Sequence, residues 1–318
     1  MKVTAALWLV LMLWVGACAH HHHEPPCAEA TADGPPPTEP HPRPYRLVDG
    51  ITGMPIPDAE WGQKLRAARL VFVGEQHDNA AHHAFQFDVL KRLHAEDASL
   101  ALALEMLPHT MQHSLSQFVA GQIDEPAFLE QVQWSQTWGF PFGLYAHLLR
   151  FARSQRLPAY ALNAPRDLVR SIYKSGVAAL APGDAQRLPE MLPGPAEHRE
   201  FARQAFAAHA TARFSDHKFE TFYEAQLLWD ETMATHLVQQ VKAPNAPAHV
   251  LVIAGEGHTR RFAVPLRVAR RGVTSALLVL AVEADEVEGA RASRVADVLA
   301  VFNDKSEKSQ TPVAIHER

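Results

Sequence analysis

Residues 70–77 read LVFVGEQH, and this stretch joins a short apolar run to a polar corner. The first four side chains are all apolar instead of alternating with polar ones, which predicts a strand buried on both faces. Gly74 allows the chain to turn sharply where the run ends. Glu75 and His77 follow at once, and both can bind a metal or transfer a proton.

The rest of the chain repeats this pattern of buried runs separated by helical stretches. Further apolar runs occupy residues 100–104, 158–162, 249–254 and 275–282. Residues 80–95 instead place apolar side chains at helical spacing. The sequence therefore predicts an α/β fold with a parallel-sheet core and helices on both faces.

Two connections are much longer than the dozen or so residues that a crossover between parallel strands needs. Residues 111–155 and 166–240 have helical compositions, and several prolines divide the second stretch into separate helices. We expect these insertions to form a smaller helical subdomain over one end of the sheet.

The N-terminus has the pattern of an exported lipoprotein. One lysine precedes an apolar run too short to span a bilayer, which predicts a signal peptide over residues 1–17. Val15-Gly16-Ala17-Cys18 resembles a bacterial lipobox, with Cys18 as the lipidated residue. Residues 18–46 are rich in proline and histidine and predict a tether. A folded domain over residues 47–302 and a polar tail over residues 303–318 complete the chain.

Composition narrows the classes of function. The 318 residues carry a formal net charge of −5, so no global positive field favours nucleic acid as a partner. The two cysteines, Cys18 and Cys27, precede the domain, which excludes a disulfide framework, a thiolate zinc site and a cysteine nucleophile within it. Histidine is abundant, with 19 residues. The run His20 to His23 leaves metal chelation and an accident of a polar linker equally open.

Three predicted strands end in residues able to do chemistry. Glu75 and His77 follow the first, Glu105 ends the second, and a second G-E-x-H corner with His258 follows the fourth. Parallel strands end on the same side, so we expect these four side chains to meet in one cleft at the carboxyl edge of the sheet. They could bind a divalent metal or serve as general acid and base. Helix capping and buried ion pairs are the structural alternative for each motif taken singly.

Other polar and aromatic residues are less decisive. A solvated position is expected for His82 and His83, although one of them could face the site. Core packing is favoured for the aromatic residues at 134–142, with an aromatic wall for a flat ligand as the alternative. The segment that begins with Trp229 is predicted to be helical. On this helix, Asp230 and Glu231 should not both point inward.

Six motifs follow one another along the chain: Gly74-Glu75-Gln76-His77-Asp78-Asn79 with His82 and His83; Leu104-Glu105-Met106; the segment with Trp134, Trp138 and Tyr145; Asn163-Ala164-Pro165-Arg166; Ala225-Gln226 leading to Trp229-Asp230-Glu231-Thr232-Met233-Ala234; and Ala254-Gly255-Glu256-Gly257-His258. Together they resemble the ChaN family of haem-binding lipoproteins, from about residue 47 to about residue 285. The wider superfamily of Tiki-type metalloproteases, TraB proteins and erythromycin esterase-like enzymes shares the two glycine–histidine motifs and the intervening glutamate.

The resemblance implies iron-regulated haem binding at the outer membrane, with cofacial haems in a homodimer, tyrosine ligation and histidine support for the propionates. Tyr145 is the first choice for the ligand and Tyr223 the second. The resemblance also suggests cofactor contacts for other residues, namely His82, His83, Trp138 and Asp230. We expect Trp138, Tyr145 and Asp230 near the rim of the cleft.

Two functions follow from these observations. The first is a lipid-anchored haem-binding protein of the bacterial cell envelope, which acquires, stores or relays haem. The second is a hydrolase, metal-dependent or metal-free, built on the four strand-end residues, in which one group activates water and the others hold a metal or stabilise charge.

Overall fold

The computed structural model describes residues 44–209 and 216–302. In this part of the chain, seven strands form one sheet in the order β1-β7-β6-β2-β5-β3-β4. The strands are β1 (Tyr45–Asp49), β2 (Leu70–Glu75), β3 (Leu100–Pro108), β4 (Ala159–Asn163), β5 (His249–Gly255), β6 (Ala276–Glu283) and β7 (Val298–Phe302). The predicted signal peptide with Cys18, nearly all of the tether, and the polar tail lie outside the described residues.

The sheet is mixed, with a parallel core. β2 pairs in parallel with both β5 and β6, β3 pairs in parallel with β4 and β5, and β6 pairs in parallel with β7. The five predicted strands are all present. β1 and β7 were not predicted, and β1 runs antiparallel to β7 at the edge. β1 therefore uses Tyr45 and Arg46, which the sequence assigned to the tether.

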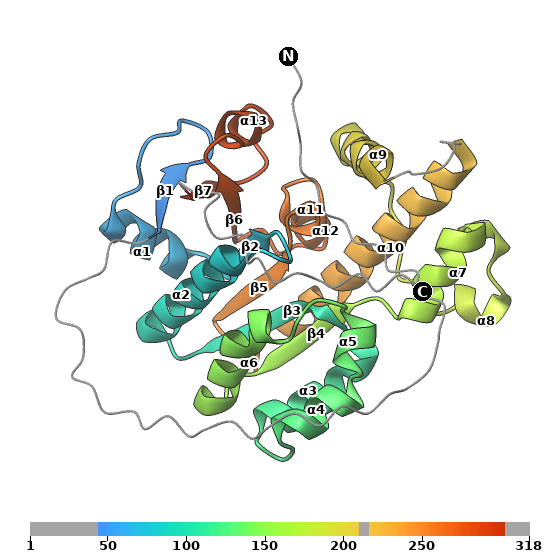
Figure 1. Ribbon diagram of the computed structural model, residues 1–318, viewed down its shortest axis with the longest axis horizontal. Helices are drawn as coiled ribbons and strands as arrows, with labels where there is room; N and C mark the ends of the chain where they lie inside the picture. Colours follow the sequence, from blue (N-terminus) through green and yellow to red (C-terminus); the bar gives the residue numbers. More distant parts are fainter. Residues whose placement is uncertain (1–43, 210–215, 303–318) are drawn as a thin grey trace, which may run out of the picture.

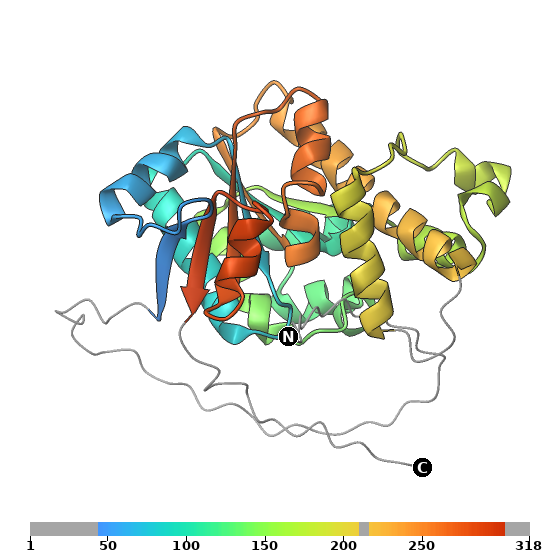
Figure 2. The same ribbon diagram turned by 90° about the horizontal axis from the view of Figure 1, so that it is seen from above.

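Helices cover both faces of the sheet (Figures 1 and 2). Between β1 and β4 lie α1 (Asp58–Ala67), α2 (Ala80–Glu96), α3 (Gln112–Val119), α4 (Glu125–Gln131), α5 (Trp134–Thr137) and α6 (Gly143–Gln155). After β4 follow α7 (Arg166–Ser175), α8 (Pro182–Ala185), α9 (Ala196–His209), α10 (Asp216–Val241), α11 (Glu256–Thr259), α12 (Val264–Arg270) and α13 (Val287–Ala292). Short 3-10 helices span His109–Met111 and Val177–Ala179.

The two faces of the sheet bury two separate apolar cores. On β2, Val71 and Val73 pack with side chains of α1, α2, α3 and α6. Leu70 and Phe72 point the other way and pack with α10 and α12. This alternation follows from the two-residue period of a strand. Because both faces are covered, the strand carries apolar side chains throughout, which is the pattern visible in the sequence.

The two long insertions pack in different places. Helices α3 to α6, in residues 111–155, pack on one face of the sheet, and the segment from α5 to α6 reaches its carboxyl edge, where Tyr145 donates to Glu75. The second half of α10 covers the opposite face. Its first half packs with α7 and α9 in two smaller clusters that stand beside the sheet (Figure 2). The smaller helical subdomain is therefore confirmed for the second insertion.

The described residues include no helix that is both long and apolar enough to cross a membrane.

Candidate functional site

The carboxyl edge of β2, β5 and β3 gathers the four predicted strand-end residues. These strands are neighbours in the order β2-β5-β3, and Glu75 pairs in register with Gly255. Glu75, His77, Glu105 and His258 are all buried. His258 Nε2 lies 3.4 Å from a Glu105 oxygen, and His77 Nδ1 lies 2.9 Å from a Glu75 oxygen. The structure thus brings the four together, as the topology predicts; we call them the strand-end cluster.

Glu75 is the most heavily hydrogen-bonded member of the cluster. Its Oε1 accepts from the Tyr145 hydroxyl at 2.7 Å and faces His77 Nδ1 at 2.9 Å. Its Oε2 accepts from Gln86 Nε2 at 2.7 Å and lies 3.0 Å from His83 Nδ1. Burial alone would raise the pKa of this carboxyl, but the charge of His83 and these hydrogen bonds hold the pKa well below its usual range.

His83 is held as an imidazolium by its neighbours. Nε2 lies 3.0 Å from the His77 carbonyl oxygen, which can only accept, so Nε2 carries a proton. Nδ1 faces Glu75 Oε2 and, at 3.1 Å, the side-chain oxygen of Gln86. Because the Gln86 amide nitrogen already donates to Glu75, its oxygen is also an acceptor. Both ring nitrogens therefore donate. Burial lowers the pKa of His83, but Glu75 together with the hydrogen bonds to His77 and Gln86 raises it overall.

His258 lies between two carboxylates. Its Nδ1 is 2.7 Å from Asp230 Oδ1, and its Nε2 faces Glu105. Burial opposes the charged ring, yet Glu105 and Asp230 together raise the pKa of His258 to about 8. Glu105 also accepts a 2.7 Å hydrogen bond from the Gly255 N–H. The pKa of His77 is raised as well, despite burial, by Glu75 and Glu105. The cluster thus alternates carboxylates with imidazoles.

Neither glycine of the two G-E-x-H corners leaves room for a side chain. A Cβ on Gly255 would lie 2.6 Å from His77 Cε1 and 2.9 Å from His77 Nε2. A Cβ on Gly74 would lie 2.2 Å from the Thr259 hydroxyl oxygen. Neither Gly74 nor Gly255 has a positive φ, and Gly255 has φ −58°, which any residue adopts. The expectation that Gly74 serves a sharp turn is therefore wrong; at both corners glycine lets neighbouring segments pack closely.

Asp230 and Glu231 are both buried, so the expectation that only one could point inward is wrong. Helix α10 packs against β4, α9 and α12, which leaves no solvated side at this point. The fully buried Arg267 explains how both charges are tolerated: its Nη1 is 3.2 Å from Asp230 and its Nε is 3.1 Å from Glu231. His198 adds a 3.0 Å contact to Asp230. The other ions compensate for the lost hydration.

His82 and His83 are both buried, and the expectation of a solvated position is wrong. Asn79 caps α2 by accepting from the N–H groups of Ala81 and His82, so both histidines lie in the first turn of this helix, directly after the end of β2. His82 Nδ1 accepts from the Gln76 N–H at 3.1 Å, and its ring packs 5.0 Å from Phe302. Burial lowers the pKa of His82 to about 4. Only His83 reaches the strand-end cluster.

Aromatic rings border the cluster beside His77. The ring centroids of Trp138 and Phe140 lie 4.7 and 5.0 Å from that of His77, and both side chains are half-buried. Trp134 is a core residue whose Nε1 donates to the Phe140 carbonyl. Trp134 is therefore a core residue, as the sequence favours, whereas Trp138 and Phe140 keep a partly exposed aromatic edge.

Neither Tyr145 nor Tyr223, the two predicted iron ligands, lies at the rim of a cleft. Tyr145 is fully buried beneath the cluster, and burial together with Glu75 raises the pKa of its phenol well above 10. Tyr223 is buried in the helical subdomain with its hydroxyl 3.2 Å from His198 Nδ1. Asp230 also lies inside, next to His258. Of the three residues expected at the rim, Trp138 alone is partly exposed.

Sequence reasoning missed Gln86, His198 and Arg267. Gln86 left one signal, a polar side chain on the apolar face of the predicted helix at 80–95. His198 and Arg267 lie far from the motifs and reach Asp230 only through tertiary packing. Within the described residues, no group of three or more His, Cys, Asp or Glu side chains has the arrangement of a metal site.

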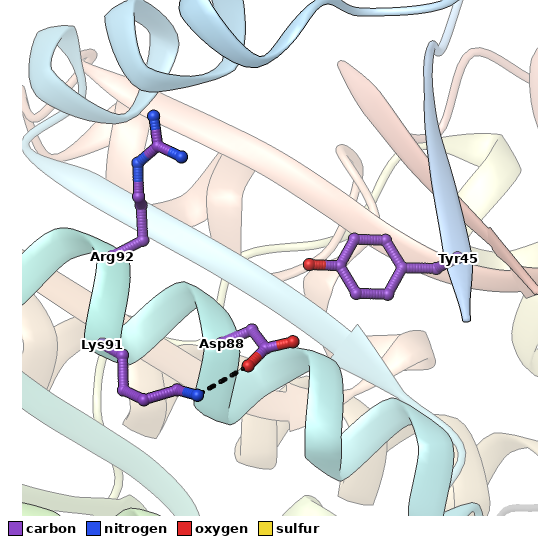
Figure 3. Close-up of a pocket in the computed structure, with 4 residues that line it drawn as sticks. All are labelled: Tyr45, Asp88, Lys91 and Arg92. Atoms are coloured by element: carbon purple, nitrogen blue, oxygen red, sulfur yellow. Dashed lines mark ion pairs between the residues drawn. The ribbon is translucent and has the colours of Figure 1, made fainter. Parts of the chain in front are cut away.

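A pocket of about 330 Å³ lies elsewhere, between β1 and α2. Figure 3 shows its lining residues, Tyr45, Asp88, Lys91 and Arg92. Lys91 pairs with Asp88 at 2.9 Å, and Arg92 pairs with Asp58 at 3.0 Å. None of the lining residues belongs to the strand-end cluster.

The fold and the cluster together define the class: an α/β protein with paired glutamate–histidine corners at the carboxyl edge of a mainly parallel sheet. The sequence pattern of one family in that class, described as "Haem-binding uptake, Tiki superfamily, ChaN", matches residues 61–268. The chain belongs to this family.

A comparison with solved structures agrees with the fold. The structure titled "Cofacial heme binding to ChaN of Campylobacter jejuni" is 19% identical, with a TM-score of 0.66 over 82% of this chain and 97% of that chain. A mutant of the erythromycin esterase EreC, in its open conformation, is 14% identical, with a TM-score of 0.45 over 75% and 77% of the two chains. The type III effector HopBA1 is 13% identical, with a TM-score of 0.43 over 82% and 97%. A comparison with curated proteins finds no match.

Proposed function

We propose that this protein binds haem and serves in its uptake, storage or relay from a lipid anchor in the bacterial cell envelope. Membership of the haem-binding ChaN family supports haem as the ligand. The observation that carries the proposal is the partly exposed aromatic edge of Trp138 and Phe140, packed against His77. Binding sites for flat ligands are built from such apolar surfaces with a few polar groups beside them.

The residues at this edge fit the porphyrin and its carboxylates. Trp138 and Phe140 provide ring faces for an apolar macrocycle. Arg166 donates to the carbonyl oxygen of Gln136, two residues before Trp138, which places a guanidinium beside the edge. Guanidinium groups suit carboxylates. Haem, when bound, supplies an iron centre with an open coordination position.

The two predicted tyrosine ligands do not fit the iron in this structure. The Tyr145 hydroxyl donates to Glu75 from a fully buried position, and the high pKa of the phenol opposes a phenolate there. The Tyr223 hydroxyl faces His198, and burial raises its pKa too. Ligation by either residue would require the helices that cover it to move.

Haem binding is tested by titrating the purified protein with ferric haem and following the Soret band. Trp138→Ala and Phe140→Ala should each weaken binding by about tenfold or more, because a large buried aromatic contact contributes roughly 1.5–3 kcal/mol. Phe151→Ala is the matched control: Phe151 is a half-buried aromatic residue that packs against His94 and Phe87, away from this edge. Equal affinity in all variants would place haem elsewhere.

Lipid anchoring at Cys18, in the outer membrane, completes the proposal together with a homodimer that forms on haem binding. The lipobox and the proline-rich segment support the anchor. Incorporation of labelled palmitate should be lost in Cys18→Ser, and the variant should leave the membrane fraction. Retention of both label and location would refute the anchor. Sedimentation with and without haem tests the dimer.

A hydrolase is the second candidate, and one observation favours it. His77 and His258 each have Nδ1 held by a carboxylate, Glu75 and Asp230 respectively. A carboxylate on one ring nitrogen is the usual support for a catalytic or metal-binding histidine. Metal analysis and assays with ester and peptide substrates test this candidate, with the His77→Ala/His258→Ala double variant as the control for any metal or turnover found.

A further inference from the structure

A row of cations lies along α7, on the side of the helix away from its buried residues. Arg166, Arg170 and Lys174 follow one another every fourth residue, a spacing that places side chains along one side of a helix. Leu168 and Ile172 are the buried residues of α7. Arg170 and Lys174 are exposed, and Arg166 is half-buried. The helix therefore presents its cations outward, starting from its first residue.

Acidic side chains of the fold do not neutralise the two arginines. Across residues 44–209 and 216–302, neither Arg166 nor Arg170 forms an ion pair. Asp167, the acid next to Arg166 in the chain, pairs with Arg187 at 2.7 Å, and Arg187 also pairs with Asp184 at 2.9 Å. Burial and the charge of Arg170 lower the pKa of Arg166. Like charges four residues apart destabilise a helix, so this pair costs stability unless an anion binds to it.

Arg166 stands beside the aromatic edge of Trp138 and Phe140. α7 follows β4, whose last residue pairs with β3 at the carboxyl edge of the sheet. The Arg166 guanidinium donates through Nη1 to the carbonyl oxygen of Gln136. Gln136 precedes Trp138 by two residues, so their Cα atoms are at most about 7 Å apart. A guanidinium has more N–H donors than this bond uses, and the described part of the chain offers them no other acceptor.

The resemblance to the haem-binding family implies histidine support for the propionates, but the histidines near this edge are occupied or neutral. His83 donates from both ring nitrogens to groups of the protein. Burial lowers the pKa of His82 to about 4, so its ring carries no charge at neutral pH. His77 and His258 are each held by a carboxylate. A ligand carboxylate at the edge therefore meets guanidinium, whose paired donors match its two oxygens.

We propose that Arg166 and Arg170 form a subsite for two neighbouring carboxylates of one flat ligand, which makes the protein selective for dianionic porphyrins. Cβ atoms four residues apart on a helix are about 5–6 Å from each other, so the two guanidinium groups can receive both carboxylates of one molecule. The propionates of haem are such a pair. Lys174 lies about 12 Å along the helix from Arg166 and attracts the anion without binding it. This inference rests on the haem binding proposed above.

The test titrates the full chain with ferric haem and with ferric haem dimethyl ester, whose propionates carry no charge, in the same dilute detergent. The wild-type protein should bind haem about tenfold or more tighter than the ester, because hydrogen bonds between charged groups are the strong ones. Arg166→Gln should remove most of this preference, and Arg170→Gln should reduce it about two- to fivefold, as for an exposed ion pair. Affinity for the ester should stay unchanged in both variants.

Two variants are matched controls. Lys174→Gln removes a cation of the same helix that lies too far from the edge to touch the ligand. Arg46→Gln removes an exposed arginine on β1, at the opposite edge of the sheet from β4. Both should keep the preference for haem. Arg166→Lys keeps the charge but not the paired donors, and should restore part of the preference that Arg166→Gln loses.

An unchanged preference for haem in both glutamine variants, Arg166→Gln and Arg170→Gln, would overturn the subsite and leave haem binding intact. An equal loss of haem and ester would also overturn it, because the arginines would then only hold the aromatic edge in place. Within the described residues Arg170 makes no hydrogen bond or ion pair, so Arg170→Gln reports on the ligand alone. A wild-type protein that gives no Soret shift with either probe would refute haem binding itself.

Discussion

Replacement of Glu75 by glutamine should destabilise the protein strongly, although the two side chains have nearly the same shape. Glu75 is fully buried. Its carboxylate oxygens contact four polar side chains at hydrogen-bond distance, those of Tyr145, His77, Gln86 and His83. An amide has one acceptor atom in place of two, and its NH₂ group would face donors. The His83 imidazolium would also lose its counter-ion.

Breaking a buried ion pair by removing one partner costs about 3–5 kcal/mol. For a domain of this size, each kcal/mol shifts the melting temperature by about 2–4 °C, so Glu75→Gln should lower it by about 6–20 °C. Chemical and thermal unfolding followed by circular dichroism give both quantities. Tyr145→Phe removes one hydrogen bond to the same carboxylate and should cost less, about 1.5–3 kcal/mol.

The control is Glu130→Gln, an exposed glutamate on α4, which should change stability by no more than about 0.5 kcal/mol. A Glu75→Gln protein within about 1 kcal/mol of the wild type would contradict this prediction. It would mean that the carboxylate is not the charge that holds His83 and His77 in place.

The remaining predictions concern pH, packing, buried charge and haem. The pKa of His258 in the folded protein is about 8, above the ordinary 6.5, so the stabilisation from its charged ring is complete below about pH 6.5 and is lost as the pH rises through 8. The free energy of unfolding should therefore fall by about 2 kcal/mol between pH 6 and pH 9. His258→Gln should flatten that dependence on pH. Gly255→Ala should cost about 1–3 kcal/mol in denaturant because its Cβ meets the His77 ring, whereas Gly183→Ala, with nothing within 4 Å, should be close to neutral. Arg267→Met should lower stability by about 3–5 kcal/mol, since Asp230 and Glu231 would lose the buried cation that they share; a variant as stable as the wild type would contradict this and show that Arg271, His198 and His258 suffice as partners. Tyr145→Phe should keep its Soret shift with ferric haem, and loss of that shift would restore Tyr145 as the ligand.

The fold was predictable from the sequence wherever burial was complete on both faces. The five predicted strands are apolar throughout because helices cover the sheet on both sides. β1 lies at the sheet edge, where exposed Arg46 and half-buried Asp49 interrupt its apolar side chains, so no apolar run marks it. β7 (VLAVF) is apolar throughout and fully buried, so the criterion that found the other five strands applies to it as well and should have predicted it.

The strand-end cluster was predictable because it depends on topology. Parallel strands end on one side, so Glu75, Glu105 and His258 had to lie at the same edge once their strands were recognised. Its outer partners were not predictable. Asp230, His198 and Arg267 meet through the packing of α9, α10 and α12, and a helix buried on two sides has no simple apolar stripe in its sequence.

Titration of the full chain with ferric haem asks whether this protein binds haem at the aromatic edge. The wild-type protein should give a saturable Soret shift that weakens in Trp138→Ala and Phe140→Ala but not in Phe151→Ala. A wild-type protein with no saturable Soret shift would contradict this expectation.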